Sequence, residues 1–174
     1  MTTAERGVVV RDARPADATA VAAIYNHFIT NTLVTFEEER LAEEAMARRI
    51  TEVQDAGLPW YVAESGGSVV GYAYGTKWHK RHGYRFSAEV TVYLAPDQGG
   101  KGIGTALYTP LLDKLRDLGF RSAIGGIALP NDASVALHEK FGFKKVAHYE
   151  RIGVKFGQWL DVGYWQCHLQ DVSL

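Results

Sequence analysis

Apolar residues near the start of the chain recur with the spacing of one helix face. The positions i, i+3, i+4 and i+7 of an amphipathic helix are occupied by Val21, Ile24, Tyr25 and Phe28. The segment 14–17 just before them contains a proline, a residue that suits the first turn of a helix. The pattern therefore predicts a helix that opens in this segment and buries one face.

Three further segments have helical patterns. The stretch 41–56 places Met46, Ile50 and Val53 on one face among charged residues, and a short helix is expected from 130–132 to Lys140. The longest pattern follows a glycine-rich turn and stops at a glycine, which commonly ends helices. We expect its leucine stripe to lie in the core: Leu107, Leu111, Leu112, Leu115 and Leu118.

Segments with strand character lie between these helices. The stretches 60–64 and 69–74 flank Ser65-Gly66-Gly67-Ser68, a turn that predicts a β-hairpin. Strands alternate with helices in the middle of the chain and form hairpins at both ends, so we expect an α/β fold with a mixed sheet. The other expected strands are 8–11, 86–94, 122–129, 144–155 and 159–169.

The length of 174 residues suits one domain, placed at 1–174, because domains usually contain about 100–200 residues. The 19 basic and 20 acidic side chains leave no basic excess for nucleic acid. The segment 1–11 lacks the apolar core of a signal peptide, no apolar run is long enough to span a bilayer, and Cys167 has no partner for an internal disulfide. We expect a cytoplasmic protein that binds neither nucleic acid nor membrane.

The segment Gln98-Gly99-Gly100-Lys101-Gly102-Ile103-Gly104-Thr105 joins a predicted strand to a predicted helix. Its glycines let the backbone approach a ligand, and the helix N-terminus favours an anion such as a pyrophosphate. A Walker loop is excluded because Lys101 is followed by Gly102, and a dinucleotide fingerprint is excluded because Leu107 stands where its third glycine is required. An ordinary glycine-rich turn remains the alternative.

This turn resembles the pyrophosphate loop of the GNAT superfamily of acyl-CoA-dependent N-acyltransferases, Gln/Arg-x-x-Gly-x-Gly/Ala. Gly102 and Gly104 match its glycines, whereas Gly99 takes the Gln/Arg position and Gln98 stands one residue early. The segment 131–143 resembles the second signature, Asn-x-x-Ala-x-x-x-Tyr-x-x-x-Gly-Phe. There Ser134 takes the small position and His138 replaces the tyrosine.

From about residue 11 to 169 the chain is similar to the phosphinothricin and methionine sulfoximine/sulfone acetyltransferases within this superfamily. Members acetylate the α-amino group of small amino-acid analogues, usually as homodimers. The resemblance implies the same reaction, acetyl-CoA as co-substrate and a homodimer for this chain. It is carried by the segments 25–28, 35–36, 87–94, 129–132, 134–135, 137–139 and 153–166.

N-acetylation needs a neutral amine, and an α-amino group titrates near pH 8, so a modest base suffices. Glu89 is the candidate, because burial in a partly dry cleft raises the pKa of a carboxyl. The alternative is a surface glutamate paired with Arg85 or Lys77. His138 is a candidate second base, proton shuttle or acid, and Tyr108 a candidate to reach the sulfur. Each would otherwise be an ordinary packed side chain.

The resemblance also implies binding residues. The pantetheine arm of acetyl-CoA is expected along Val92-Tyr93-Leu94, where neighbouring strands splay, with its pyrophosphate on the glycine turn and Asn131 further up the arm. Arg81 and Tyr84 match positions for the acceptor's anionic group, and Phe36 matches an aromatic wall. The basic loop 76–85 that contains the first two reads otherwise as solvated surface. The pyrophosphate is expected on the residues 100–105, and the turn residues expected to bind acetyl-CoA are Gly99, Gly100, Lys101, Gly102, Ile103, Gly104 and Thr105.

Two other functions stay open from the sequence. The acceptor would then be another amine, such as a protein N-terminus, a lysine, a polyamine or an aminoglycoside, or the chain would be a catalytically silent CoA sensor. The presence of both Glu89 and His138 counts against the sensor. No metal site is expected, because the six histidines and one cysteine show no ligand spacing.

Overall fold

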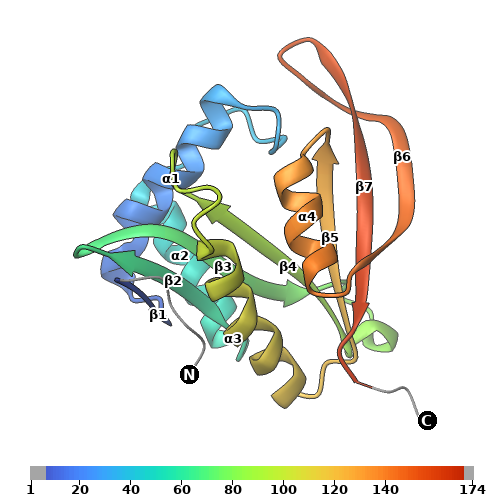
Figure 1. Cartoon of the computed structure of the whole chain (residues 1–174), viewed down its shortest axis with the longest axis horizontal. Helices are drawn as coiled ribbons and strands as arrows, with labels where there is room; N and C mark the ends of the chain where they lie inside the picture. Colours follow the sequence, from blue (N-terminus) through green and yellow to red (C-terminus); the bar gives the residue numbers. More distant parts are fainter. Residues whose placement is uncertain (1–6, 171–174) are drawn as a thin grey trace.

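The computed structural model describes residues 7–170. The ends of the expected domain, 1–174, and the first residues of the segment 1–11 lie outside the described residues. Within them, one sheet has the order β1-β2-β3-β4-β5-β7-β6 (Figure 1). Only β4 and β5 pair in parallel, so the predicted mixed sheet is confirmed. The strands are β1 (Val8–Asp12), β2 (Trp60–Ser65), β3 (Ser68–Lys77), β4 (Ser87–Leu94), β5 (Ser122–Leu129), β6 (Lys144–Lys155) and β7 (Gln158–His168).

The four predicted helices are present. A 3₁₀ turn at Pro15–Asp17 leads into the first helix, and Asn131 caps the last one by accepting a hydrogen bond from the Ser134 amide. No helix among residues 7–170 is long and apolar enough to cross a membrane. The helices are α1 (Ala18–Asn31), α2 (Glu43–Asp55), α3 (Ile103–Asp117) and α4 (Asp132–Lys140).

Two apolar cores lie on opposite faces of the sheet. One forms where α3 packs on the strands through Leu107, Leu111 and Leu115, and the other where α1 and α2 pack on the opposite face (Figure 1). Successive side chains of a strand point to opposite faces. Accordingly Val90 of β4 belongs to the core under α3, and Tyr93 packs against the core under α1.

Leu118 departs from the predicted leucine stripe. It is 43% exposed, whereas the other four leucines of the stripe are buried. The helix ends at Asp117, and the chain then turns through Gly119 in the left-handed conformation, with φ of 87°. Leu118 therefore lies past the face that α3 packs on the sheet. Trp60 and Trp165 are buried, but Trp159 is exposed on β7.

The parallel strands β4 and β5 separate soon after they meet. Their pairing covers only Ser87 to Glu89 of β4, opposite Ser122 to Ile124 of β5. Beyond Glu89, β4 continues beside β3 alone, and β5 continues beside β7 alone (Figure 1). The two strands thus diverge like the arms of a V, and their facing backbone edges are not joined in a ladder there.

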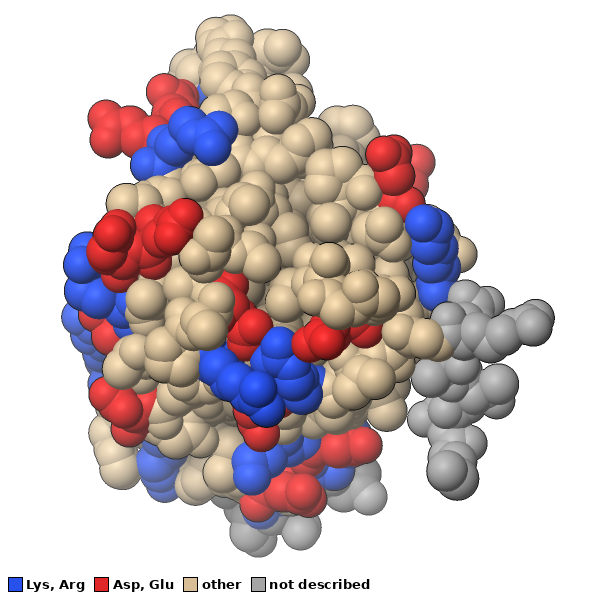
Figure 2. Space-filling view, turned by 90° about the vertical axis from the view of Figure 1, so that its left-hand side faces the viewer, with Lys and Arg blue, Asp and Glu red and all other residues tan. Residues whose placement is uncertain are grey.

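The surface charges show no large region of one sign on the face that corresponds to the left side of Figure 1. Figure 2 shows lysine and arginine side chains next to aspartate and glutamate side chains over this face. The ion pairs of the structure include those of Arg11 with Asp17 and Glu64. This face therefore does not resemble the continuous basic surface that polyanions require.

Candidate active site

A cavity of about 540 Å³ lies where β4 and β5 diverge. It is bounded by α1, β3, β4, the glycine turn, α3, β5 and α4, so segments far apart in the sequence meet there. Its size suits a small ligand or one part of a larger one. Of the residues expected in a site, the cavity is lined by Glu89, Val92, Tyr93, Leu94, Gly99, Tyr108, Asn131 and His138.

Glu89 is the last residue of β4 that pairs with β5, so its side chain stands at the vertex of the V. It shares a strand face with Thr91 and Tyr93, the face covered by α1. Burial raises the pKa of the Glu89 carboxyl, and the charge of nearby His79 opposes that shift. Within residues 7–170 no ion pair joins Glu89 to Arg85 or Lys77, unlike the surface-glutamate alternative.

Tyr108 and His138 form a buried hydrogen-bonded pair on the opposite face of β4. The Ser134 carbonyl can only accept, so the 2.7 Å contact from His138 Nδ1 places a proton on Nδ1. Burial lowers the pKa of His138 and favours the neutral ring, whose Nε2 accepts a hydrogen bond from the Tyr108 hydroxyl at 3.0 Å. Burial also raises the pKa of Tyr108 well above its ordinary value, so the phenol stays protonated.

The ring of His138 fits here because β5 has no side chain at Gly125. A methyl group on Gly125 would overlap the imidazole. Phe143 also packs its ring at 5.1 Å from the imidazole, and the side chain of Tyr108 is fully buried between α3, which carries it, and the sheet. The pair is therefore held rigidly against the sheet. A carboxyl group and a phenol–imidazole pair consequently approach one cavity from two faces of the same strand.

The glycine turn presents backbone groups at the start of α3. Gly100 and Gly102 have φ of 73° and 78°, values that side chains rarely permit, and Gly102 is the N-cap of the helix. Gly104 has a different role, since a methyl group there would lie 3.0 Å from Leu137 of α4. The Thr105 hydroxyl accepts a hydrogen bond from Lys140 at 3.1 Å, which brings an ammonium group to the first turn of α3.

The three residues expected to bind the acceptor do not line the cavity with Glu89. Arg81 and Tyr84 line a neighbouring pocket of about 910 Å³ between α2 and the loop after β3, because the 3₁₀ turn His82–Tyr84 carries this loop outward. Phe36 lines a third pocket beside β6 and β7, where it lies over Gly153. The structure thus places Arg81 and Tyr84 in one depression and Phe36 in another, beside β6 at Gly153.

Other residues of the cavity were not singled out by the sequence. An aromatic wall is made by Tyr25 and Phe28 of α1 with Tyr74 of β3. The rings of the first two lie 5.2 and 5.0 Å from Tyr93. The helix pattern assigned Tyr25 and Phe28 to a buried helix face, and the family resemblance of their segment gave them no role in a site. Tyr74 carried no signal.

Tyr164 of β7 was also missed. Its ring lies 5.7 Å from that of Trp78, and it borders the two pockets beside β6 and β7. Burial raises the pKa of its phenol, and so does the negative charge of Glu89. Among the described residues, no group of three or more histidine, cysteine or acidic side chains is arranged to hold a metal ion.

Comparison with known proteins gives consistent matches over nearly the whole chain. The family model described as an acetyltransferase (GNAT) domain matches residues 10–163. Phosphinothricin N-acetyltransferase of Streptomyces viridochromogenes is 39% identical over 166 residues, which cover 95% of this chain and 90% of that protein. The L-methionine sulfoximine/L-methionine sulfone acetyltransferase of Salmonella typhimurium is 34% identical over 164 residues, 94% of this chain and 96% of that protein.

The same relationship holds in three dimensions. A GNAT superfamily phosphinothricin acetyltransferase from Sinorhizobium meliloti, solved in complex with acetyl-CoA, superposes with a TM-score of 0.90 at 37% identity. The match covers 93% of this chain and 88% of that one. The resemblance expected from the two sequence signatures is confirmed, and this chain belongs to the GNAT acetyltransferase family.

Proposed function

We propose that this protein transfers the acetyl group of acetyl-CoA to the α-amino group of a small amino-acid analogue of the phosphinothricin, methionine sulfoximine or methionine sulfone type. The observation that carries the proposal is the placement of Glu89 and the Tyr108–His138 pair on two faces of one cavity. Relatives with these substrates in their names cover nearly the whole chain, which supports the acceptor class.

Glu89 acts as the base in this proposal. The acceptor amine reaches β4 from the face covered by α1, where its ammonium proton passes to the Glu89 carboxylate. The raised pKa of Glu89 brings the carboxyl closer to the pKa of an α-amino group, which makes the transfer more favourable. The neutral nitrogen then attacks the thioester carbonyl, and the C–S bond breaks as the N–C bond is completed. The new amide nitrogen loses its second proton, which balances protonation of the CoA sulfur, and CoA leaves as the thiol.

Tyr108 serves the leaving sulfur from the other face. Its hydroxyl turns from His138 Nε2 towards the sulfur and donates a hydrogen bond to the developing thiolate. His138 holds the phenol in place between turnovers, because its Nε2 accepts and its Nδ1 is committed to Ser134. Glu89 and Tyr108 lie on opposite faces of β4, so the Glu89 carboxylate does not compete with the sulfur for the Tyr108 proton.

Acetyl-CoA suits the open edge of β4. The backbone from Val90 to Leu94 is not paired with β5, so its edge is available to the amides of the pantetheine arm. The glycine turn and the first amides of α3 would hold the pyrophosphate, aided by the Lys140 ammonium near Thr105. Asn131 lines the same cavity further along the arm.

We expect Gly102→Val to raise the KM for acetyl-CoA about tenfold or more, because a side chain in the left-handed conformation costs about 1–2 kcal/mol and crowds the donor amides. Gly119→Val is the matched control at the other end of α3, where φ is 87° and nothing lies within 4 Å of an added methyl. It should lower the melting temperature similarly without changing this KM. Equal KM values in the two variants would contradict the proposed pyrophosphate site.

The pocket that contains Arg81 supports an acceptor with an acidic or strongly polar group. Lys77, Lys80 and Arg81 line it with a single carboxylate, that of Glu52. Such an environment attracts phosphinate, sulfone and carboxylate oxygens and repels polyamines. Arg81 can hold such oxygens through charge-assisted hydrogen bonds. His79 borders this pocket and also interacts with the charge of Glu89, which links the pocket to the vertex of the V.

Turnover of acetyl-CoA with a panel of amines tests the function. We expect acetylation of at least one of phosphinothricin, methionine sulfoximine and methionine sulfone, and no comparable efficiency on spermidine or a lysine peptide. Arg81→Ala should raise the acceptor KM about three- to tenfold and leave the acetyl-CoA KM unchanged, an effect limited by the exposure of the side chain. Turnover only with polyamine or lysine acceptors would reject the substrate class and keep the acetyltransferase. Acetyl-CoA binding without turnover would indicate the silent sensor.

We also propose that the chain is a single domain spanning 1–174 that acts as a homodimer in the cytoplasm. The family match over residues 10–163 and the one continuous sheet support the first point. The half-buried Cys167, free in the described structure, supports a reducing compartment. A dimer is supported by the exposed apolar side chains on β6, on β7 and in the turn between them, and light scattering measures it directly. They are Val146, Tyr149, Ile152, Val154, Phe156 and Trp159.

A further inference from the structure

Lys155, the last residue of β6, is fully buried, with 0% of its surface exposed. Lysine is rarely buried to this extent, because removing an ammonium group from water is costly unless partners replace the water. Burial accordingly lowers the pKa of Lys155, and the charge of Glu38 opposes that shift. The proposed acetyl transfer does not use the Lys155 ammonium, so the energetic cost of burying it indicates a different role.

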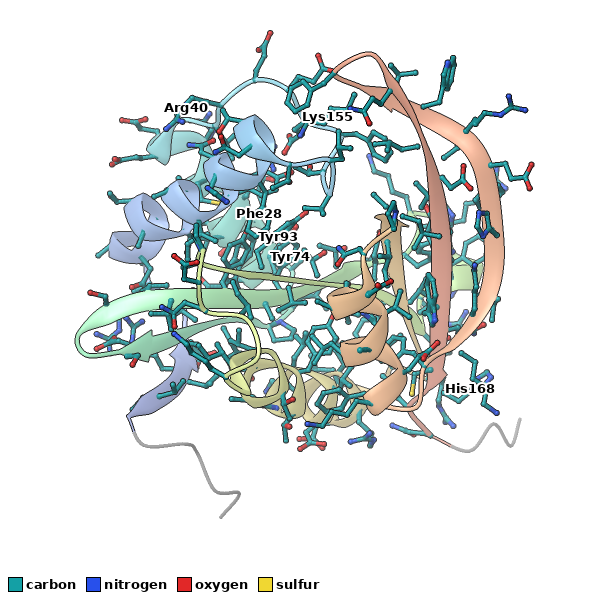
Figure 3. The ribbon with its side chains drawn as sticks, turned by 45° about the horizontal axis from the view of Figure 1, so that its top comes forward. Phe28, Arg40, Tyr74, Tyr93, Lys155 and His168 are labelled. Carbon is teal, nitrogen blue, oxygen red and sulfur yellow. The ribbon has the colours of Figure 1, made fainter. Side chains whose placement is uncertain are left out.

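The hydrogen-bond partner of Lys155 lies on α1, the helix that packs against Tyr93 of β4. Its Nζ donates a hydrogen bond to the backbone carbonyl of Phe28 at 3.3 Å, in the last turns of α1. The same carbonyl accepts from the amide and the hydroxyl of Thr32, at 3.3 and 2.8 Å. The C-terminal end of a helix carries partial negative charge, so a buried ammonium is favourable there. Figure 3 shows Lys155 between the β6–β7 hairpin and the chain that follows α1.

A second contact lies beside the first. Phe36, from the segment 32–41 between α1 and α2, packs over Gly153, where any side chain would overlap its ring. The segment is itself anchored to the helices, since Asn26 bonds the backbone of Leu41 and Arg49 pairs with Glu37. The two contacts therefore join β6 to the end of α1 and to the braced segment that follows it, at the open end of the V.

The carbonyl that Lys155 holds belongs to a residue of the cavity. The Phe28 ring lies 5.0 Å from that of Tyr93 and lines the cavity with Glu89 on the acceptor side of β4. Figure 3 shows Phe28, Tyr93 and Tyr74 in succession below Lys155. At the vertex, β4 and β5 are held by their own pairing, but at the mouth such pairing is absent. Movement of α1 away from β6 would widen the mouth and shift this aromatic wall.

We propose that Lys155 is a positioning residue that bridges β6 to the end of α1, fixes the width of the cleft mouth and thereby places the aromatic wall of the acceptor site. The effect on the acceptor site rests on the proposed function, whereas the bridge between β6 and α1 rests on the geometry alone. It assigns Lys155 no contact with substrate. Its loss should affect the acceptor, which meets Phe28, far more than acetyl-CoA, which meets the glycine turn and α3.

Lys155→Met removes the ammonium and keeps an unbranched side chain. We expect the acceptor KM to rise about tenfold, because displacements of about 1 Å in a substrate site are costly, with the acetyl-CoA KM changed by less than about twofold. Lys155→Arg, which retains a donor and a positive charge, should recover most of the acceptor affinity. Lys144→Met, an exposed lysine at the start of the same strand, is the control and should behave as the wild type.

Hydrogen exchange supplies a readout that does not depend on turnover. In Lys155→Met the amides of 28–41 should exchange faster, while those of β5 and α4 should keep the wild-type rate. Equal rises in both KM values with a general increase in exchange would show a merely structural role and overturn the proposal, as would unchanged exchange at 28–41. If the wild type acetylates no amino-acid analogue, the proposed function fails, and exchange at 28–41 still decides the bridge.

Discussion

Glu89→Gln is expected to lower kcat by about 10²–10⁴-fold, the range that loss of one general base produces. The substitution keeps the shape of the side chain at the vertex of the V and removes only its ability to take a proton. The acetyl-CoA KM should stay near the wild-type value, because Glu89 lies on the face of β4 away from α3. Steady-state kinetics with each substrate varied separately measures both effects.

The pH profile separates a base from a merely polar contact. Glu89 acts when ionised, and burial raises its pKa above the ordinary 4.5, so the wild-type rate should rise with pH through a midpoint above 4.5. That limb should be missing in Glu89→Gln. Glu44→Gln, at an exposed position on α2, is the control and should retain both the rate and the limb. A wild-type rate in Glu89→Gln would exclude the carboxylate as the base.

The same variant should not be less stable than the wild type. A carboxyl whose pKa is raised by folding binds its proton more tightly in the folded state, so stability falls as the pH rises through that pKa. Glutamine does not ionise, so it removes this cost at neutral pH. Thermal unfolding at pH 7 should therefore give a melting temperature equal to or above that of the wild type, which also excludes misfolding as the cause of the lost activity.

Tyr108→Phe is expected to lower kcat about 10²-fold or more, because the developing thiolate loses its hydrogen-bond donor. The ring remains in the core between α3 and the sheet, so the fold and the acetyl-CoA KM should change little. Tyr61→Phe, which removes a half-buried phenol from β2 outside the cavity, is the control. Rapid-mixing measurements of a single turnover show whether the chemical step itself is slowed.

Substitution of His138 tests whether the imidazole acts through Tyr108 or directly on the reactants. If the imidazole acts through Tyr108, His138→Ala should slow turnover, and the double variant with Tyr108→Phe should be no slower than Tyr108→Phe alone. Additive effects would indicate that His138 has its own contact with the reactants. Wild-type rates in both single variants would remove the pair from the proton path and leave water as the donor to the sulfur.

Much of the fold was predictable because its signals are local. The spacing of Val21, Ile24 and Phe28 identifies a helix wherever it packs, and the Ser65–Ser68 turn closes a hairpin through its own backbone preferences. Leu118 was misassigned because the exact end of α3 depends on the turn at Gly119. One residue of difference there decides whether a side chain faces the sheet or solvent.

The site was predictable in part. Glu89, His138 and Asn131 stand in segments whose order along the chain resembles known signatures, and the structure brings them to one cavity. Arg81 and Phe36 were expected to contact the acceptor, and they line pockets beside this cavity, because the loops that carry them are placed by distant contacts. Tyr74 lines the cavity and Tyr164 borders two neighbouring pockets, each from a strand that sequence patterns identify only as sheet.

The sequence by itself determined the order of helices and strands, the glycine turn before α3 and the family, since these depend on spacing within short segments. Tertiary structure alone decided which face of β4 carries Glu89, which nitrogen of His138 accepts from Tyr108, and that buried Lys155 bridges β6 to α1. These features depend on where β4 leaves β5 and on contacts between residues far apart in the chain. No local pattern encodes such contacts, because they form only when the whole sheet is assembled.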